Sequence, residues 1–354
     1  MLKLIYAPGD GIGPEIGEIA LKILKFQLDK YDIEYSITPI LFGGASIDAY
    51  GSPLTDENLN KIKASDAVLL GAVGGPKWDK VDASVRPEKG LLKLRKECGA
   101  YANFRPAVIF DCLKDSSPLK RSIIDKGVDI MIVRELSGGI YFGQRSEGEY
   151  EAYDTEYYSY SEIQRIVIKG FECAMKRRKK LCLVDKANVL ASSRLWRRVF
   201  EKIAPEYPEV QISEMYVDNA AMQLSCAPYK FDTIVTSNLF GDILSDEASV
   251  ITGSIGLLPS ASIGDIDIYE PIHGSAPDIA GKNIADPIGM ILSAAMLFRY
   301  KLGLEKPARE IEISVNNVLE AGFRTADIAS GDVNEHISTT IEIGDAIFNG
   351  LQRQ

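Results

Sequence analysis

Histidine is nearly absent from this chain: its 354 residues include only His273 and His336. Five cysteines make an odd set, and no two of them form a Cys-x-x-Cys pair. These shortages argue against a zinc site, which needs several such ligands, and against triads that depend on histidine. Unpaired thiols fit a reducing compartment, so we expect a cytoplasmic protein.

Long apolar runs and surplus basic charge are also missing. No stretch of about 18 apolar residues occurs, which argues against a membrane span, and the first residues lack the layout of a signal peptide. A net charge of −10 argues against nucleic acid or an anionic membrane as a general partner. The 46% hydrophobic and 25% charged residues are ordinary for a globular protein, and the length predicts about two domains.

Short apolar runs alternate with longer helical patterns along the chain. The runs at residues 2–7, 67–70, 129–134, 181–184 and 233–236 predict buried strands, and residues 14–28 and 289–300 predict helices, the second buried all round. This alternation predicts an α/β fold with a largely parallel central sheet, whose ligands gather beyond the carboxyl ends of the strands. Residues 138–160 carry six tyrosines and predict either an arm on another subunit or a surface hairpin.

Two aspartates, Asp242 and Asp246, are the most informative pair in the sequence. On a helix, residues four apart share one face with Cβ atoms roughly 5–6 Å apart. Carboxylates at that distance repel, and their hard oxygens suit Mg²⁺ or Mn²⁺. Asp218, after another strand-like run, can complete this site or cap the helix that it opens. Taken alone, the pair also fits two solvated aspartates near a helix N-terminus.

Three arginines follow strand or helix patterns and suit a substrate with two carboxylates. Arg134 ends a strand, Arg105 follows in Asn-Phe-Arg-Pro106, and Arg95 ends a helical face that begins at Glu88. Guanidinium groups grip carboxylates with two hydrogen bonds. The same helical face carries Leu91 and Leu92, so it can bind a ligand that also has a branched alkyl group. Surface ion pairs and a core-facing helix are the alternative interpretations.

An acid–base pair is suggested by Lys186 and Tyr141. Lys186 ends an apolar strand, and Tyr141 follows a glycine pair that permits close approach. A divalent cation near the lysine would lower its pKa, so that it could act as a base. A tyrosine beside such a lysine can serve as a general acid.

Two glycine-containing loops suggest a nucleotide-binding site, the first more weakly than the second. Gly9-Asp-Gly-Ile-Gly-Pro-Glu15 lacks the third glycine of the dinucleotide fingerprint and is a weak signal. The loop from Glu270 to Ile279 offers backbone donors, the His273 ring and the Asp278 carboxylate. A carboxylate that binds ribose hydroxyls would repel a 2′-phosphate, so this loop favours NAD over NADP.

In this order, the motifs resemble those of the β-decarboxylating dehydrogenases, a family that includes isocitrate and 3-isopropylmalate dehydrogenases. The resemblance runs almost end to end, and Leu-Leu-Lys-Leu-Arg95 is similar to the isopropylmalate branch. It implies oxidative decarboxylation of 3-isopropylmalate with NAD⁺ in leucine biosynthesis, by at least a homodimer. Homoisocitrate, tartrate or malate-type substrates are the alternatives within the family.

The resemblance also implies roles for individual residues. Arg95, Arg105 and Arg134 would bind the malate carboxylates, and Leu91, Leu92 and Val189 would surround the isopropyl group. Lys186 would take the C2 hydroxyl proton, and Tyr141 would help to protonate the enolate. Mg²⁺ or Mn²⁺ would bind Asp242, Asp246 and Asp218, with Asp218 and Lys186 supplied by the second subunit of a shared active site. Residues implied to line the cofactor are Glu88, Asn238, His273, Gly274, Ala276, Asp278, Ile279 and Asp286.

The implied fold is not a Rossmann fold. A first domain would combine residues 1–100 and 255–354 and bind the cofactor; residues 101–254 would form a second domain with the dimer contact. Ala285-Asp-Pro287 stands where relatives often have Ala-Asn-Pro, so Asp286 puts a carboxylate near the expected adenine site. A protein that binds a dicarboxylate without turnover, and a metal-dependent decarboxylase without redox chemistry, are alternatives from other classes.

Overall fold

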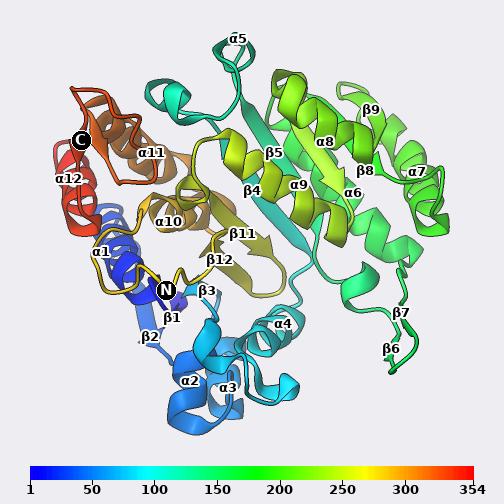
Figure 1. Cartoon of the computed structure of the whole chain (residues 1–354), viewed down its shortest axis with the longest axis horizontal. Coiled ribbons are helices and arrows are strands. Elements are labelled where there is room, and N and C mark those ends of the chain that lie inside the picture. The colour runs from blue at the N-terminus through cyan, green and yellow to red at the C-terminus, as the bar shows by residue number, and fades with distance from the viewer. The chain divides into compact units, whose positions relative to one another are not determined.

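The computed structural model describes all 354 residues and divides the chain into two compact units. Unit 1 comprises Met1–Ala100, Phe110–Ser116 and Ser254–Gln354; unit 2 comprises Tyr101–Ile109 and Ser117–Gly253. Both chain ends belong to unit 1, where the C-terminal helix α12 (Thr340–Gln352, red) packs beside α1 (Gly13–Lys30, blue) (Figure 1). Each unit is an α/β structure with a largely parallel set of strands, so the predicted fold class is confirmed.

In unit 1 the strand order is β2-β1-β3-β12-β11. Neighbours run parallel, apart from the antiparallel pair β11 and β12. Every residue of β3 is buried, as expected for an apolar strand covered on both faces. The strands are β1 (Leu2–Gly9), β2 (Tyr35–Pro39), β3 (Ala67–Ala72), β11 (Pro259–Ile263) and β12 (Asp267–Pro271), with a small pair β13 (Phe323–Arg324) and β14 (His336–Ile337).

Helix α10 (Ile288–Tyr300) forms the centre of the helical layer of unit 1. Its residues from Ile288 to Phe298 are all buried, which confirms the predicted buried helix. It packs against α1 and α11, both of which have one apolar face. The other helices of unit 1 are α2 (Gly43–Tyr50), α3 (Asp56–Lys63), α4 (Pro87–Glu97) and α11 (Glu305–Glu320), with 3-10 turns at Pro76–Trp78, Ala83–Val85, Asp111–Ser116 and Ile255–Leu257.

In unit 2 the strand order is β4-β5-β10-β8-β9, and only β4 and β5 are antiparallel. The strands are β4 (Ala102–Val108), β5 (Asp129–Glu135), β8 (Lys180–Asp185), β9 (Gln211–Tyr216) and β10 (Thr233–Thr236). The helices are α5 (Arg121–Ile124), α6 (Tyr160–Met175), α7 (Ala191–Ile203), α8 (Val217–Cys226) and α9 (Asn238–Ile251), with 3-10 turns η4 (Gly139–Tyr141), Ala204–Glu206 and Pro228–Lys230. Helix α9 begins two residues after β10 and therefore carries its first turns to the carboxyl edge of the strands.

The tyrosine-rich segment contains a hairpin of β6 (Arg145–Glu147) and β7 (Ala152–Asp154). Tyr150 at its tip is 92% exposed, and Tyr153 is also exposed. The hairpin thus stands at the surface of a single chain. Tyr158 differs, because it is buried.

Packing of the backbone explains the glycines of the first motif. A Cβ on Gly9 would lie 2.0 Å from the carbonyl oxygen of Ala72, and one on Gly11 would lie 2.0 Å from that of Ser275. The Asp10 carboxylate accepts hydrogen bonds from the backbone N–H groups of Gly44, Ala45 and Gly74, each at 2.8 Å. The motif therefore ties three loops of unit 1 together.

No helix is both long enough and apolar enough to cross a membrane.

Two glycines with the same backbone angle allow a direct test of this packing. Gly9 and Gly51 both have φ of +73°, but a Cβ on Gly51 would meet no atom within 4 Å. Gly51→Ala should cost only the left-handed strain, about 1 kcal/mol. Gly9→Ala should cost at least about 2 kcal/mol more, because the backbone of β3 must also move. Urea unfolding of both variants measures the difference, and equal losses would contradict the explanation.

Candidate functional site

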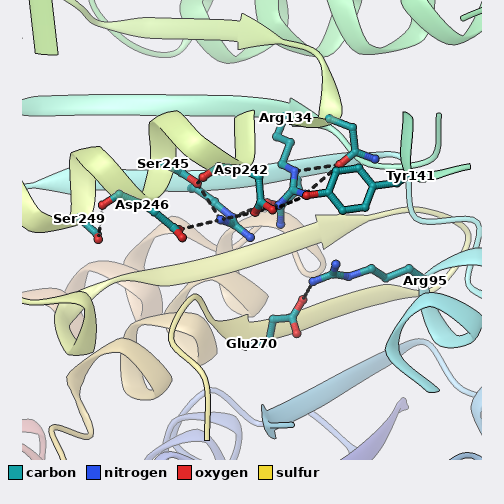
Figure 2. A network of polar contacts seen from close by, with 11 residues as sticks. Arg95, Arg134, Tyr141, Asp242, Ser245, Asp246, Ser249 and Glu270 are labelled. Carbon is teal, nitrogen blue, oxygen red and sulfur yellow. Dashed lines mark hydrogen bonds and ion pairs between the residues drawn. The ribbon is translucent and has the colours of Figure 1, made fainter. Parts of the chain in front are cut away.

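Two arginines from neighbouring strands meet the aspartates of α9. Arg134 near the end of β5 donates from Nη1 to Asp242 Oδ1. Arg105 on β4 places Nη1 3.4 Å from Asp242 Oδ1 and 3.5 Å from Asp246 Oδ1. Ser245 accepts from the same Nη1 at 2.6 Å. Figure 2 shows Arg134 next to the α9 side chains Asp242, Ser245 and Asp246. The helix spacing of the aspartates, predicted from sequence, is therefore what lets both face the arginines.

Tyr141 and Asn238 extend this cluster into a closed ring. The Tyr141 hydroxyl donates to Asp242 Oδ2 at 2.7 Å (Figure 2). Asn238 Oδ1 accepts from Arg134 Nε at 3.1 Å and from Nη2 at 2.8 Å, and its Nδ2 donates to the Gly138 carbonyl at 3.1 Å. Gly138 leads into η4, which carries Tyr141. The ring links β5, η4 and α9.

Burial shapes the electrostatics of this cluster. The Arg134 and Arg105 side chains are almost fully buried, whereas the Asp246 side chain is 61% exposed. Burial raises the pKa of Tyr141, and the Asp242 carboxylate adds to the effect, so the phenol keeps its proton at neutral pH. Burial also raises the pKa of Asp246, with Asp242 adding and Arg105 opposing. The exposed edge of the cluster thus presents carboxylate oxygens of both aspartates, with the Arg105 guanidinium group close to each.

Lys186 and Asp218 form a separate pair in unit 2. Lys186 follows β8, Asp218 lies in the first turn of α8, and Lys186 Nζ donates to Asp218 Oδ1. This hydrogen bond lowers the pKa of Asp218. Tyr216, not Asp218, is the N-cap residue of α8, so the alternative interpretation of Asp218 as a helix cap is wrong.

Within one chain, nowhere do three or more histidine, cysteine or acidic side chains gather in a way that could hold a metal ion. Asp218 therefore does not join Asp242 and Asp246 in a single chain. Its contribution from a second subunit stays a prediction.

An ion-pair cluster lies next to the Lys186–Asp218 pair. Asp185 accepts from Arg197 Nε at 2.6 Å and Nη2 at 3.0 Å, and also from the Ala187 N–H at 2.9 Å. The Arg197 guanidinium lies 5.0 Å from the centre of the Tyr216 ring. One arginine thus contacts the loop that carries Lys186 and the residue before α8.

Helix α4 in unit 1 divides its faces as a ligand-binding helix would. Gly90 and Leu94 are buried, but Leu91 and Leu92 are only half-buried and Glu88 is exposed. Arg95 Nη2 lies 3.0 Å from Glu270 Oε1, while its Nε is buried without a hydrogen-bond partner. The helix therefore leaves two leucines half-buried and the Nε atom of Arg95 without a hydrogen-bond partner. Val189, in unit 2, is exposed.

The loop after β12 is open and partly strained. His273 Nδ1 lies 2.9 Å from the Gly274 carbonyl, and burial lowers the pKa of the His273 ring, which favours its neutral form. Ala276 has a φ of +39°, which is uncommon outside glycine. Asp278 is exposed, and Ile279 is half-buried. The loop offers a neutral imidazole and an exposed carboxylate to a ligand.

Asp286 is a buried acid at the start of α10. Its Oδ1 accepts the backbone N–H of Ile288 at 2.8 Å. Burial, with a contribution from the Asp327 carboxylate, raises the pKa of Asp286 to about 8. At neutral pH this side chain is a neutral acid rather than the carboxylate that the sequence suggested.

Several contacts of these clusters were not predicted from the sequence. They are the hydrogen bonds of Glu270 with Arg95, of Asn103 and Ser245 with Arg105, and of the Asp10 carboxylate with backbone N–H groups. Ser245 carried a signal, because it lies one turn from Asp242. Glu270 carried none, since it is 175 positions away from Arg95.

Comparison with known proteins assigns the class. The model of the isocitrate/isopropylmalate dehydrogenase family matches residues 3–347. A chain with this match and this α/β architecture is an enzyme of the dehydrogenase class. It belongs to the isocitrate/isopropylmalate dehydrogenase family, as the motif order suggested.

Individual relatives narrow the comparison. Proteins named 3-isopropylmalate dehydrogenase are 54% identical in Pseudomonas fluorescens, over 99% of both chains, and 55% identical in Clostridium pasteurianum, over 92% of this chain and 93% of the relative. The crystal structure of isocitrate dehydrogenase from Methylococcus capsulatus superposes with a TM-score of 0.86 at 33% identity, covering both chains completely. A β-decarboxylating dehydrogenase from Thermococcus kodakarensis gives a TM-score of 0.81 at 36% identity, over 100% of this chain and 97% of its own.

Asp286 should make stability depend on pH. The unfolded side chain ionises near pH 4, whereas the folded one keeps its proton up to about pH 8. Between these values the unfolded state binds fewer protons, so this residue lowers stability as pH rises. Asp286→Asn should therefore gain stability relative to the parent chain from pH 5 to pH 8, by up to several kcal/mol on an order-of-magnitude estimate. Melting temperatures of both proteins across that range measure the gap, and a constant gap would contradict the assignment.

Proposed function

We propose that this chain catalyses the oxidative decarboxylation of 3-isopropylmalate to 4-methyl-2-oxopentanoate and CO₂, with reduction of NAD⁺, in leucine biosynthesis. The identity of 54–55% over nearly the whole chain to proteins named for this activity carries the proposal. The half-buried Leu91 and Leu92 beside Arg95 support it, because 3-isopropylmalate combines a branched alkyl group with carboxylates. Burying an isopropyl group contributes about 1.5–3 kcal/mol.

Arginines would hold the two carboxylates of the substrate. Arg105 and Arg134 are buried and fixed by Asn103, Asn238 and Asp242, so little side-chain entropy remains to be lost when an anion binds. Arg95 has a buried Nε that lacks a partner in the chain. Val189 would complete the apolar pocket with Leu91 and Leu92.

The donor set of α9 fits a hard divalent cation. Asp242 and Asp246 present carboxylate oxygens on one helical face, and burial, with Asp242 adding and Arg105 opposing, raises the pKa of Asp246, so that a further positive charge would favour its ionised form. We infer that Asp242 and Asp246, with Asp218, hold Mg²⁺ or Mn²⁺. Such an ion would polarise the substrate oxygens and stabilise the charge that develops as CO₂ leaves.

Lys186 and Tyr141 would move protons. Lys186 Nζ, paired with Asp218, would accept the proton of the C2 hydroxyl as hydride leaves C2. Tyr141, which keeps its proton through burial and Asp242, would donate toward the enolate carbon. Asp242 orients this hydroxyl through the hydrogen bond at 2.7 Å.

Unit 1 would bind NAD. The His273 loop, with Gly274, Ala276, Asp278 and Ile279, supplies the surroundings, and the Asp278 carboxylate would accept from ribose hydroxyls and repel a 2′-phosphate. Glu88 and Asp286 of unit 1 and Asn238 of unit 2 complete the proposed set. Because Asp286 is neutral at pH 7, it would meet an adenine edge without a charge.

A homodimer with shared active sites explains why the proposed residues form two groups. Arg134, Arg105, Tyr141 and the α9 aspartates make one group, and Lys186 with Asp218 makes the other. In the proposed enzyme, each site combines the first group of one subunit with the second group of its partner.

Substrate selectivity tests the proposed activity. NADH absorbance with Mg²⁺ and NAD⁺ should show faster turnover of 3-isopropylmalate than of isocitrate, homoisocitrate, tartrate or malate. Leu91→Ser and Leu92→Asn should each lower kcat/KM for 3-isopropylmalate about tenfold or more, because an alkyl contact is replaced by a polar group. Val68→Ala, a core substitution in β3, provides a control that should not alter relative selectivity. Preference for another substrate would overturn the proposal, and unchanged selectivity in both leucine variants would show that the pocket is elsewhere.

Mixed dimers test the shared site. Lys186→Met and Asp246→Asn should each inactivate the homodimer. After the two are unfolded and refolded together, half of the dimers should be mixed and contain one intact site, so about a quarter of the parental activity should return. Lys186→Met mixed with a Lys186→Met,Asp246→Asn double variant is the control and should regain none. Absence of recovery despite mixed dimers would place both groups of each site in one subunit.

A further inference from the structure

Tyr158 stands apart from the other tyrosines of its segment. It is 5% exposed, and its ring meets Trp196 edge to face with centroids 5.4 Å apart. Its hydroxyl oxygen accepts the backbone N–H of Asn238 at 2.9 Å. That N–H belongs to the first turn of α9 and has no partner within the helix. Tyr158 therefore fixes the start of the helix that carries Asp242.

The same ring fills the space beside the turn that leads to Tyr141. A Cβ on Gly138 would lie 2.8 Å from Tyr158 Cε1, and one on Gly139 would lie 2.4 Å from the Tyr158 hydroxyl oxygen. Gly139 also has a φ of +73°. The glycine pair is thus required by this tyrosine, and one side chain touches both segments that meet at Asp242.

Glu135 holds the turn from the other side. Its side chain is fully buried and accepts from Ser137 N at 2.9 Å, Ser137 Oγ at 2.5 Å and Gly138 N at 2.8 Å. Arg165 Nη2 lies 4.0 Å from its Oε1. Because neighbouring strand residues point to opposite faces, Arg134 reaches Asp242 while Glu135 braces the turn behind it.

Glu135 also affects the pKa of Tyr158. Burial raises the pKa of both, and the Glu135 carboxylate adds to the effect on Tyr158. The bonds from Ser137 and Gly138 oppose the shift at Glu135. A carboxylate in this position is stable only while the turn keeps its N–H groups directed at it.

We propose that Glu135 and Tyr158 are positioning residues that set the place of the Tyr141 hydroxyl relative to Asp242 and Arg134. Neither side chain belongs to the proposed substrate, metal or cofactor groups. The inference rests on the proposed function only for its consequence in catalysis. The geometry itself follows from the ring of Arg134, Asn238, Gly138, Tyr141 and Asp242.

A positioning role predicts a larger effect on turnover than on binding. A displacement of about 1 Å in a reacting group can cost about a hundredfold in rate. In the proposed function the arginines would bind the carboxylates of the substrate from β4, β5 and α4, whereas the turn carries only Tyr141. The variants should therefore lower kcat and leave KM for 3-isopropylmalate within about twofold, whereas a merely structural role would lower the melting temperature with kcat unchanged.

Tyr158→Phe is the first test, because it keeps the ring and removes the hydroxyl, which accepts the Asn238 N–H and interacts with Glu135. Its kcat should fall at least about tenfold. Glu135→Gln should lower kcat as much, because it turns an amide donor toward N–H groups. Ser137→Ala removes one of the three hydrogen bonds from the turn to Glu135, so its kcat should fall less. Tyr269→Phe is the matched control: this buried tyrosine of unit 1 donates to Asp267 at 3.3 Å, and its loss should leave kcat unchanged.

The outcome that overturns the proposal is an unchanged kcat in folded Tyr158→Phe and Glu135→Gln. Should Glu135→Gln not fold, Ser137→Ala with Tyr158→Phe decides the question. A second measurement does not depend on the substrate: the NMR signal of ¹³Cζ-labelled Tyr141, assigned with Tyr141→Phe, should move in Tyr158→Phe but not in Tyr269→Phe. If the parent chain does not oxidise 3-isopropylmalate, the proposed function fails, and an unmoved Tyr141 signal would separately reject the positioning role.

Discussion

The ion pair between Arg134 and Asp242 is the contact on which the rest of unit 2 depends. Arg134 is buried on a central strand, and a guanidinium group cannot lose its proton there, so it must be paired. Asp242 meets this need because α9 starts immediately beyond the neighbouring strand β10. The other hydrogen-bonding atoms of both groups bind Asn238, Tyr141 and Arg105. One obligatory ion pair thus fixes the positions of the groups proposed to handle the substrate and its protons.

The two sides of this cluster differ in burial. The arginine side is buried and hydrogen-bonded, whereas the carboxylate side reaches solvent at Asp246. Pairing Asp242 with arginine in one chain stabilises the fold, while burial, with Asp242 adding and Arg105 opposing, raises the pKa of Asp246 and disfavours its ionised form. A divalent cation held with Asp218 from a second subunit, as proposed, would favour that form. Lys186 and Asp218 neutralise each other meanwhile, and Asp185 with Arg197 keeps their loop in place.

The fold could be predicted well because its signals are local. Apolar runs at 67–70, 129–134 and 233–236 became β3, β5 and β10 within two residues at each end, since a buried strand needs a continuous apolar run. The all-round apolar stretch became the buried helix α10. The helical spacing of Asp242 and Asp246 was equally local. The alternative interpretation of Asp218 as a helix cap was wrong, because the strand before it continues to Tyr216. The tyrosine-rich segment contains one buried tyrosine, Tyr158. Its burial comes from packing against Trp196 and the Gly138–Gly139 turn rather than from the residues next to it in the sequence, so the sequence pattern did not distinguish it.

The sequence by itself determined the strand and helix order, the carboxylate pair on one helical face and the family to which the chain belongs. These depend on periodicity and motif order, which residues carry within a few positions of each other. Only the tertiary structure decided that Arg134 faces Asp242, that Arg95 pairs with Glu270, and that Asp286 is a neutral acid. Each of these depends on burial or on partners more than a hundred positions away, or, for Asp286, on the solvent that folding removes. Charge state and pairing are properties of the packed chain, so they cannot be read from residue types alone.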